Sequence, residues 1–260
     1  MKNGTLLAAA RNVPGFCYAR AMPAFPLFTR PVDIVDFVAG AQSARGLTVV
    51  IDVFRAFSLA AYAFSRGAAS IIPVAAIEDA LALRRQYPGA LLLGEREAKP
   101  LPGFDGGNSP TDLQKFDLAG RTLIHTTHSG TQGLTRATRA DEVITGALVN
   151  AAAIVRYVHH RKPEQVTIVR MGHQARQRCA EDDLCAELLS ARLRGEDPRV
   201  DDIPARLRQA DSAQKFFDPA CDWAPEGDFQ LCTRADAFDF VLQLDRTLPV
   251  PALRRIDVAR

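Results

Sequence analysis

The chain has 260 residues, of which 47% are hydrophobic and 24% charged, and its net charge is +2. These values are typical of a globular protein with one large domain or two small ones. The near-neutral charge argues against nucleic acid or a membrane surface as a partner. The five cysteines form no CxxC pair and no cysteine–histidine zinc spacing, and no apolar run reaches transmembrane length. We therefore expect a reduced, cytoplasmic protein.

Residues 1–31 contain prolines and aromatic residues without periodicity, and we interpret them as an irregular N-terminal extension of a domain spanning 32–260. From residue 47 onward, short apolar runs alternate with amphipathic stretches, as strands alternate with helices. The predicted strands are 47–53, 70–74, 90–95, 121–126, 142–146 and 165–171. The predicted helices are 56–66, 77–87, a short one near Thr111, 130–139, 150–160 and 181–194.

The C-terminal third is less regular. A turn at 195–198 marks a candidate boundary between sub-domains, and a polar region with helical character follows up to residue 217. The tail segments 229–233 and 237–244 are expected to add an edge strand and a closing segment. The alternation of strands and helices predicts an α/β fold: a three-layer α/β/α arrangement whose mainly parallel sheet is covered on both faces. A division into two sub-domains is left open.

The loop GFDGGNSP, at 103–110, is the most informative segment. Its glycines let the backbone approach a ligand closely, and Pro110 can open a helix. Its side chains Asp105, Asn108 and Ser109 offer hydrogen bonds or metal oxygens. The alternative is an ordinary solvated loop, which is the commoner fate of such clusters.

Polar groups follow five predicted strands, at the edge where ligands bind to open parallel sheets. This convergence indicates an enzyme. The residues are Asp52, Arg55, Glu95, Arg96, Thr126, Thr127, His128, Ser129, Gly130, Thr131, Asn150, His173, Glu181 and Asp182.

The residue types favour metal-assisted phosphoryl transfer to water. Carboxylates suit Mg²⁺, arginines suit a planar anion, and a TTHSGT loop entering a helix suits phosphate. Structural alternatives remain open: Asp52 as a helix cap, Glu95–Arg96 as a surface ion pair, and the acidic run 181–183 as a partner of the helix dipole. In that run we expect Asp183 to face away from the site. The chain has no Walker A, GxGxxG or GxSxG motif.

With these residues assembled, the chain resembles the 2-phosphosulfolactate phosphatase family, the ComB-like proteins. The resemblance covers roughly residues 46 to 245. The segments that carry it are VVIDVFRAFS (49–58), LLLGERE (91–97), GFDGGNSP (103–110), HTTHSGTQG (125–133), GALVNA (146–151) and AEDDLCAE (180–187).

The resemblance implies a three-layer α/β/α fold and an Mg²⁺-dependent phosphatase that converts 2-phosphosulfolactate to 3-sulfolactate and phosphate, a step of coenzyme M biosynthesis. The implied catalytic residues are Asp52, Arg55, Glu95, Arg96 and Glu181. The implied substrate-binding residues are Asn108, Ser109, Thr127, Gly130, Thr131 and Asn150. From their place in the same loop, we also expect Thr126, His128 and Ser129 to bind substrate. The implied metal ligands are Asp52, Glu95, Asp105, Glu181 and Asp182.

The chain departs from the family pattern at three positions. Phe54 and Phe57 replace smaller residues, and Ser129 replaces an asparagine in the TTHSGT loop. We expect Phe57 to narrow the pocket, and the exact substrate is left open. The expected partner is a small anionic phosphorylated substrate, with no nucleic acid and no membrane; a homo-oligomer is left open. Two other functions also remain open: a non-catalytic binding module for anionic metabolites, and a lyase or isomerase of a small acid.

Overall fold

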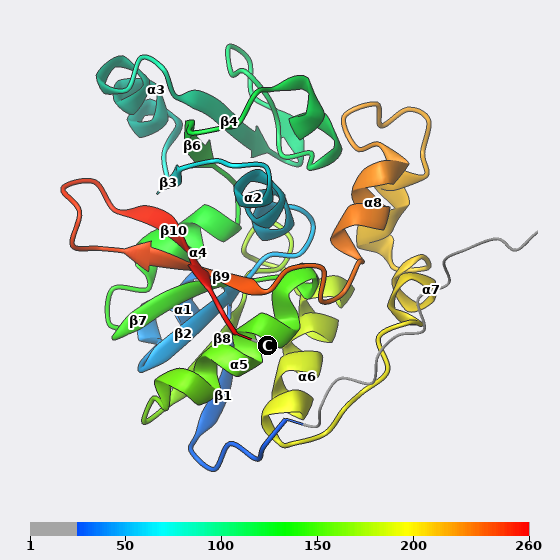
Figure 1. Cartoon of the computed structure of the whole chain (residues 1–260). Coiled ribbons are helices and arrows are strands. Elements are labelled where there is room, and N and C mark those ends of the chain that lie inside the picture. Colours follow the sequence, from blue (N-terminus) through cyan, green and yellow to red (C-terminus); the bar gives the residue numbers. More distant parts are fainter. Residues whose placement is uncertain (1–24, 260) are drawn as a thin grey trace, which may run out of the picture.

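The computed structural model describes residues 25–259 (Figure 1). Most of the expected N-terminal extension, and hence its irregular character, lies outside the described residues. Ten strands form one sheet in the order β1-β8-β2-β7-β9-β10-β3-β6-β4-β5. The strands are β1 (Val32–Asp36), β2 (Leu47–Ile51), β3 (Ser70–Val74), β4 (Leu91–Arg96), β5 (Lys99–Pro100), β6 (Thr122–Thr126), β7 (Glu142–Gly146), β8 (Val166–Arg170), β9 (Phe240–Asp245) and β10 (Ala252–Asp257).

Helices cover both faces of this sheet, and the α/β class with a mainly parallel sheet is confirmed (Figure 1). None of the helices in the described part of the chain has the length and apolar character to cross a membrane. The helices are α1 (Phe37–Ser43), α2 (Ala56–Ser65), α3 (Ile77–Gln86), α4 (Gly130–Arg136), α5 (Ala151–Arg161), α6 (Ala180–Leu193), α7 (Ile203–Leu207) and α8 (Glu226–Cys232), with 3₁₀ turns η1 (Thr111–Lys115), η2 (Leu148–Asn150) and η3 (Asp211–Phe216).

The sheet contains two parallel groups that run in opposite directions. The first group is β1, β8, β2 and β7, and the second is β3, β6 and β4. Between them lie β9 and β10, each antiparallel to its neighbours, which reverses the direction of the second group. The connection is narrow, because Ile144–Gln243 and Leu253–Ile71 are the registered pairs that join the groups to β9 and β10.

Two expectations for the tail are wrong. Segment 229–233 belongs to helix α8, and segment 237–244 enters β9 in the middle of the sheet and not at its edge. The physical reason is burial: Phe240, Val241 and Leu242 are each at most 2% exposed, so β9 is apolar on both faces as an interior strand must be. The candidate boundary at 195–198 follows α6 and stays a prediction.

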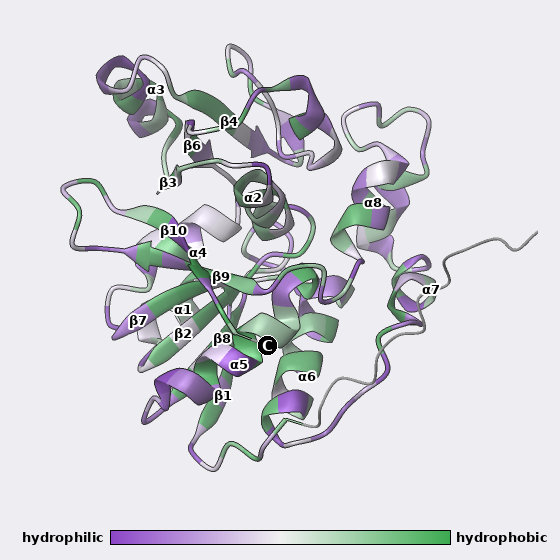
Figure 2. Cartoon of the chain, viewed as in Figure 1, coloured by the Kyte–Doolittle hydropathy of each residue, from purple (hydrophilic) through white to green (hydrophobic). Residues whose placement is uncertain are grey.

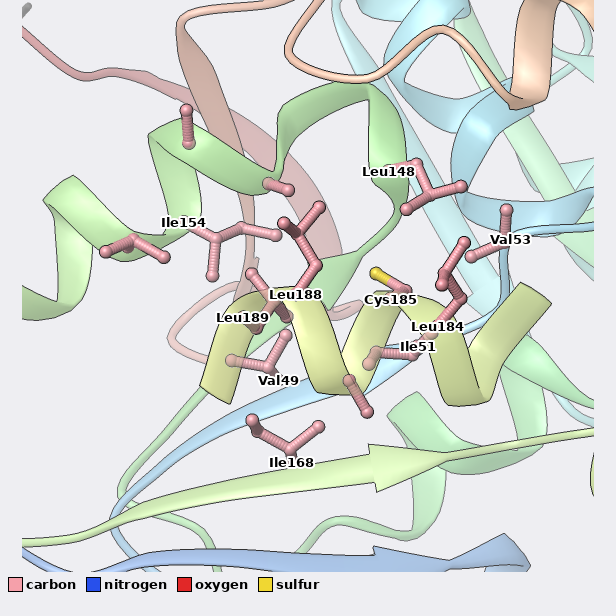
Figure 3. Packing of buried hydrophobic residues seen from close by; sticks show 14 of the residues in the cluster. Val49, Ile51, Val53, Leu148, Ile154, Ile168, Leu184, Cys185, Leu188 and Leu189 are labelled. Carbon is pink, nitrogen blue, oxygen red and sulfur yellow. The ribbon is translucent and has the colours of Figure 1, made fainter. Parts of the chain in front are cut away.

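The side chains of β2 alternate between two apolar cores, which fixes its register. Val49 and Ile51 pack with Leu188 of α6 on one face (Figure 3), and Val50 packs with α2 and α4 on the other. Helix α3 buries little and has a largely hydrophilic surface (Figure 2). The cores thus hold the ends of β2 and β8 rigidly, and these ends carry the polar loops described below.

Gly46, at the entrance to β2, provides a test of this packing. Its φ is +63°, and an added Cβ would lie 2.1 Å from the carbonyl oxygen of Gln165. We expect Gly46→Ala to lower the free energy of unfolding by at least about 1–2 kcal/mol, since both the left-handed backbone and the contact oppose a side chain. Gly89 is the matched control, because a Cβ there meets nothing within 4 Å. Urea unfolding of both variants measures the difference; equal stabilities would contradict the close approach at Gly46.

Candidate functional site

One cavity collects side chains from the ends of both parallel groups and from η3. Its polar lining includes Asp52, Arg55, Glu95, Asn108, His128, Ser129, His173, Glu181, Asp182, Ser212 and Lys215. Although the two groups run in opposite directions, their carboxyl ends meet here: Asp52 Oδ2 after β2 lies beside Gly130 after β6. Sheet twist permits this meeting, which a flat sheet would forbid. The expectation of one shared edge is therefore wrong for the sheet, while several of the residues it named do converge.

Asp52 is a buried acid that faces the neighbouring carboxyl groups of Glu95 and Glu181. It is 8% exposed, and its Oδ1 accepts a hydrogen bond from the Ala56 amide at 3.2 Å, so it also caps α2. Burial, and then the charge of Glu95, raise the pKa of Asp52 to about 7. Gly130 must lack a side chain, because a Cβ there would lie 2.8 Å from Asp52 Oδ2. The glycine thus serves close approach to a carboxylate.

The first turn of α6 supplies two further acids to the cavity. Asp182 accepts hydrogen bonds from the amides of Val53 at 2.9 Å and Gly172 at 2.8 Å, which ties the ends of β2 and β8 to α6. Burial, and then the charge of Asp52, raise the pKa of Asp182 well above its usual range. Glu181 accepts a hydrogen bond from the Ser212 hydroxyl. The next acid along, Asp183, faces away as expected and forms ion pairs with two arginines outside the cavity.

Glu95 reaches the cavity from the end of β4. Its Oε1 accepts a hydrogen bond from the His128 amide and its Oε2 accepts one from the Ala98 amide, both at 2.7 Å. The carboxylate therefore fixes the loop after β4 against the loop after β6. No ion pair forms between Glu95 and Arg96, so the surface-pair alternative is wrong.

Arg55 lines the cavity but is already neutralised. Its guanidinium forms an ion pair with Asp228 at 2.7 Å, and the two side chains are 2% and 0% exposed. It also donates to the carbonyls of Trp223 at 2.8 Å and Ala98 at 2.9 Å. Ser109 donates to the same Asp228 carboxylate at 2.7 Å, so its hydroxyl is used within the fold. No motif in the sequence points to Asp228, which lies in the short helix α8.

Two predicted site residues have structural roles instead. Arg96 donates to the carbonyls of Glu95 and Ala75 and to the hydroxyl of Thr126, and it does not line the cavity. Burial lowers the pKa of Arg96, and the charge of Glu95 opposes this shift. Asp105 also lies outside the cavity lining. It forms an ion pair with Arg84 at 2.7 Å and accepts a hydrogen bond from the Leu92 amide. The reason in each case is that nearer partners already satisfy the group.

In the TTHSGT loop, some residues bond within the loop and others line the cavity. Thr127 and Thr131 bond to each other's backbone and hydroxyl groups and are at most 1% exposed, so the cavity lining from this loop comes from His128 and Ser129. Asn150 is 1% exposed and donates to the Phe240 carbonyl, away from the cavity. The hydroxyls and amide are used to build the loop geometry. The substrate contacts expected of these residues are therefore not supported.

Three remaining positions are settled by packing. Phe57 is 1% exposed in the core beside α2 and does not narrow the cavity, whereas Phe54 lines it. His125 is a core residue as expected, with its Nε2 3.1 Å from Asn108 Oδ1. Because an amide oxygen can only accept, Nε2 donates, and this fixes the orientation of the cavity-lining Asn108 amide.

The sequence interpretation missed Lys215, which follows Ser212 by three residues in η3. Both side chains line the cavity. Burial, and then the charge of Arg55, lower the pKa of Lys215, while Glu181 and Asp52 oppose the shift. The sequence offers only a weak signal, a lysine followed by two phenylalanines in a polar stretch.

The charge balance of the cavity suggests what it binds. Five carboxyl groups line it, from Asp52, Glu95, Glu97, Glu181 and Asp182, against the cations Arg55 and Lys215. Within residues 25–259, no group of three or more His, Cys, Asp or Glu side chains forms a ready-made metal site. An anionic ligand in so acidic a cavity needs added positive charge.

Comparison with known proteins agrees with this chemistry. A family model described as 2-phosphosulpholactate phosphatase matches residues 33–247. A probable 2-phosphosulfolactate phosphatase of Thermotoga petrophila is 40% identical over 166 residues, which is 64% of this chain and 70% of the relative. One of Bacillus subtilis is 29% identical over 213 residues, 81% of this chain and 92% of the relative. By class, the chain is a phosphoric monoester hydrolase. It belongs to the 2-phosphosulfolactate phosphatase family.

His125 makes the fold sensitive to acid. Burial, and then the charge of Arg96, lower its pKa from 6.5 to about 4. Between about pH 6.5 and pH 4, His125 is protonated in the unfolded chain but stays neutral in the folded chain. The free energy of unfolding therefore decreases as the pH falls through this window. His125 accounts for a decrease in the free energy of unfolding of up to about 3 kcal/mol.

We expect His125→Gln to reduce the loss of stability between about pH 7 and pH 4, because glutamine cannot be protonated and can still donate to Asn108. Urea unfolding across this range measures the slope. His160→Gln, at an exposed position, is the control. An unchanged slope in His125→Gln would show that His125 is not held neutral by burial.

Proposed function

We propose that this protein hydrolyses 2-phosphosulfolactate to 3-sulfolactate and phosphate with the help of Mg²⁺. The single observation that carries the proposal is the convergence of Asp52, Glu95 and Glu181 in one cavity with Lys215. The names of the relatives supply the substrate, and the cavity supplies a chemistry consistent with it. A substrate with a phosphate, a carboxylate and a sulfonate is strongly anionic, so its binding to an acidic cavity requires a cation.

The donor set suits Mg²⁺ in particular. Mg²⁺ is usually held by one or two protein carboxylates together with waters and substrate phosphate, so a closed cage of three or more protein ligands is not needed. We propose that one or two of the carboxylates of Asp52, Glu95 and Glu181 hold it, since each carboxylate oxygen has lone pairs beyond the hydrogen bonds it accepts. When bound, Mg²⁺ would supply Lewis-acid stabilisation of the phosphate charge.

The chain's own groups would orient the carboxylates and activate the attacking water. The amides of His128 and Ala98 fix the Glu95 carboxylate, and the Ser212 hydroxyl fixes that of Glu181. The Ala56 amide holds the Asp52 carboxylate, and we assign to Asp52 the role of accepting a proton from an attacking water. Asp182 accepts from the amides at the ends of β2 and β8, so we assign it a positioning role.

Two variants separate chemistry from folding. We expect Asp52→Asn to lower kcat by about two to three orders of magnitude while the protein stays folded, since asparagine keeps the Ala56 hydrogen bond and removes a costly buried charge. We expect Glu95→Gln to lose both activity and about 1–3 kcal/mol of stability, because its amide group must face one of two backbone N–H donors.

The assay is phosphate release from 2-phosphosulfolactate with Mg²⁺ and with EDTA, alongside urea unfolding. Glu187→Gln, at an exposed position of α6, is the control. Full activity in EDTA would contradict the metal, and near-normal turnover in Asp52→Asn would remove Asp52 from the reaction.

A further inference from the structure

Lys215 differs from every other cation at the site in being uncommitted. Within residues 25–259 its ammonium makes no hydrogen bond or ion pair, although it lines the cavity. By contrast, Arg55, the other cation in the described cavity lining, is paired with Asp228. Lys215 is therefore the cation at this site whose charge is free for a ligand.

The geometry of η3 directs Lys215 into the cavity. A 3₁₀ helix has three residues per turn, so residues three apart lie on one face. Ser212 and Lys215 share this spacing, and Ser212 is anchored there by its hydrogen bond to Glu181. The ammonium lies 5.9 Å from the ring centroid of Phe54 and 5.1 Å from that of Phe216. The rings and the anchored turn limit where the charge can go.

We infer that Lys215 binds the sulfonate of the substrate and so selects organic phosphates that carry this second anion. The inference rests on the proposed function. The Lys215 ammonium has three N–H donors, which can donate to the three oxygens of a sulfonate. A planar carboxylate instead matches the forked guanidinium of arginine better. The acids Asp52, Glu95 and Glu181 are left for the metal and the phosphate.

The test is calorimetric binding of 3-sulfolactate and of lactate, which lacks the sulfonate, to wild type, Lys215→Met and Lys215→Arg in the presence of Mg²⁺. We expect Lys215→Met to bind 3-sulfolactate at least tenfold more weakly with lactate binding unchanged, and Lys215→Arg to recover part of the loss. With 2-phosphosulfolactate as substrate, KM should rise at least tenfold while kcat changes less than about threefold. Lys115→Met, a surface lysine paired with Asp112, is the control.

Each outcome decides the inference. Equal loss of 3-sulfolactate and lactate binding in Lys215→Met would place the contact on the shared carboxylate and overturn the sulfonate assignment. Unchanged 3-sulfolactate binding, or none to the wild type, would overturn it as well. A selective loss of 3-sulfolactate binding supports the inference even if the wild type releases no phosphate from 2-phosphosulfolactate; in that case the proposed reaction alone fails. Urea unfolding of each variant verifies that it is folded.

Discussion

The buried ion pair between Arg55 and Asp228 holds the mouth of the site together. The two residues are 173 positions apart in the chain and lie 2.7 Å from each other with almost no exposure. Through its other hydrogen bonds the pair joins the start of α2, helix α8, the loop after β4 and the loop before η1. Removing one partner of such a pair strands a buried charge and typically costs about 3–5 kcal/mol. Arg55, which the sequence predicts to act on the substrate, therefore has a structural role in joining these segments.

With Arg55 neutralised, the cavity keeps a surplus of negative charge. The raised pKa values of Asp52 and Asp182 express the cost of burying acids close together. Backbone amides offset part of that cost at Asp182 and Glu95, which makes these two acids rigid. A divalent cation would offset more of it, and the same cation would allow an anionic substrate to enter. The clustered carboxyl groups thus lower the stability of the fold, although the same cluster is what would bind a cation.

The sequence predicts most of the parallel strands, but it does not predict how the two groups of strands are joined or all the residues of the site. Buried parallel strands such as β2 and β8 appear as continuous apolar runs, so they can be recognised locally. The edge strand β1 and the charged strand β10 have no such run, and the reversal across β9 and β10 depends on pairing between distant segments. At the site, acids directly after strands or at a helix start were found. Asp228 and Lys215 were missed because tertiary contacts alone bring them to the cavity.

The most direct test of the central claim, that one or two of the carboxylates of Asp52, Glu95 and Glu181 hold the catalytic cation, is a crystal structure with Mn²⁺ in place of Mg²⁺ and vanadate as a phosphate mimic. We expect an anomalous peak within about 2.0–2.3 Å of oxygens from one or two of these carboxylates, with vanadate bound to the same ion. A metal ion bound elsewhere, or vanadate bound in the cavity without a metal, would contradict it.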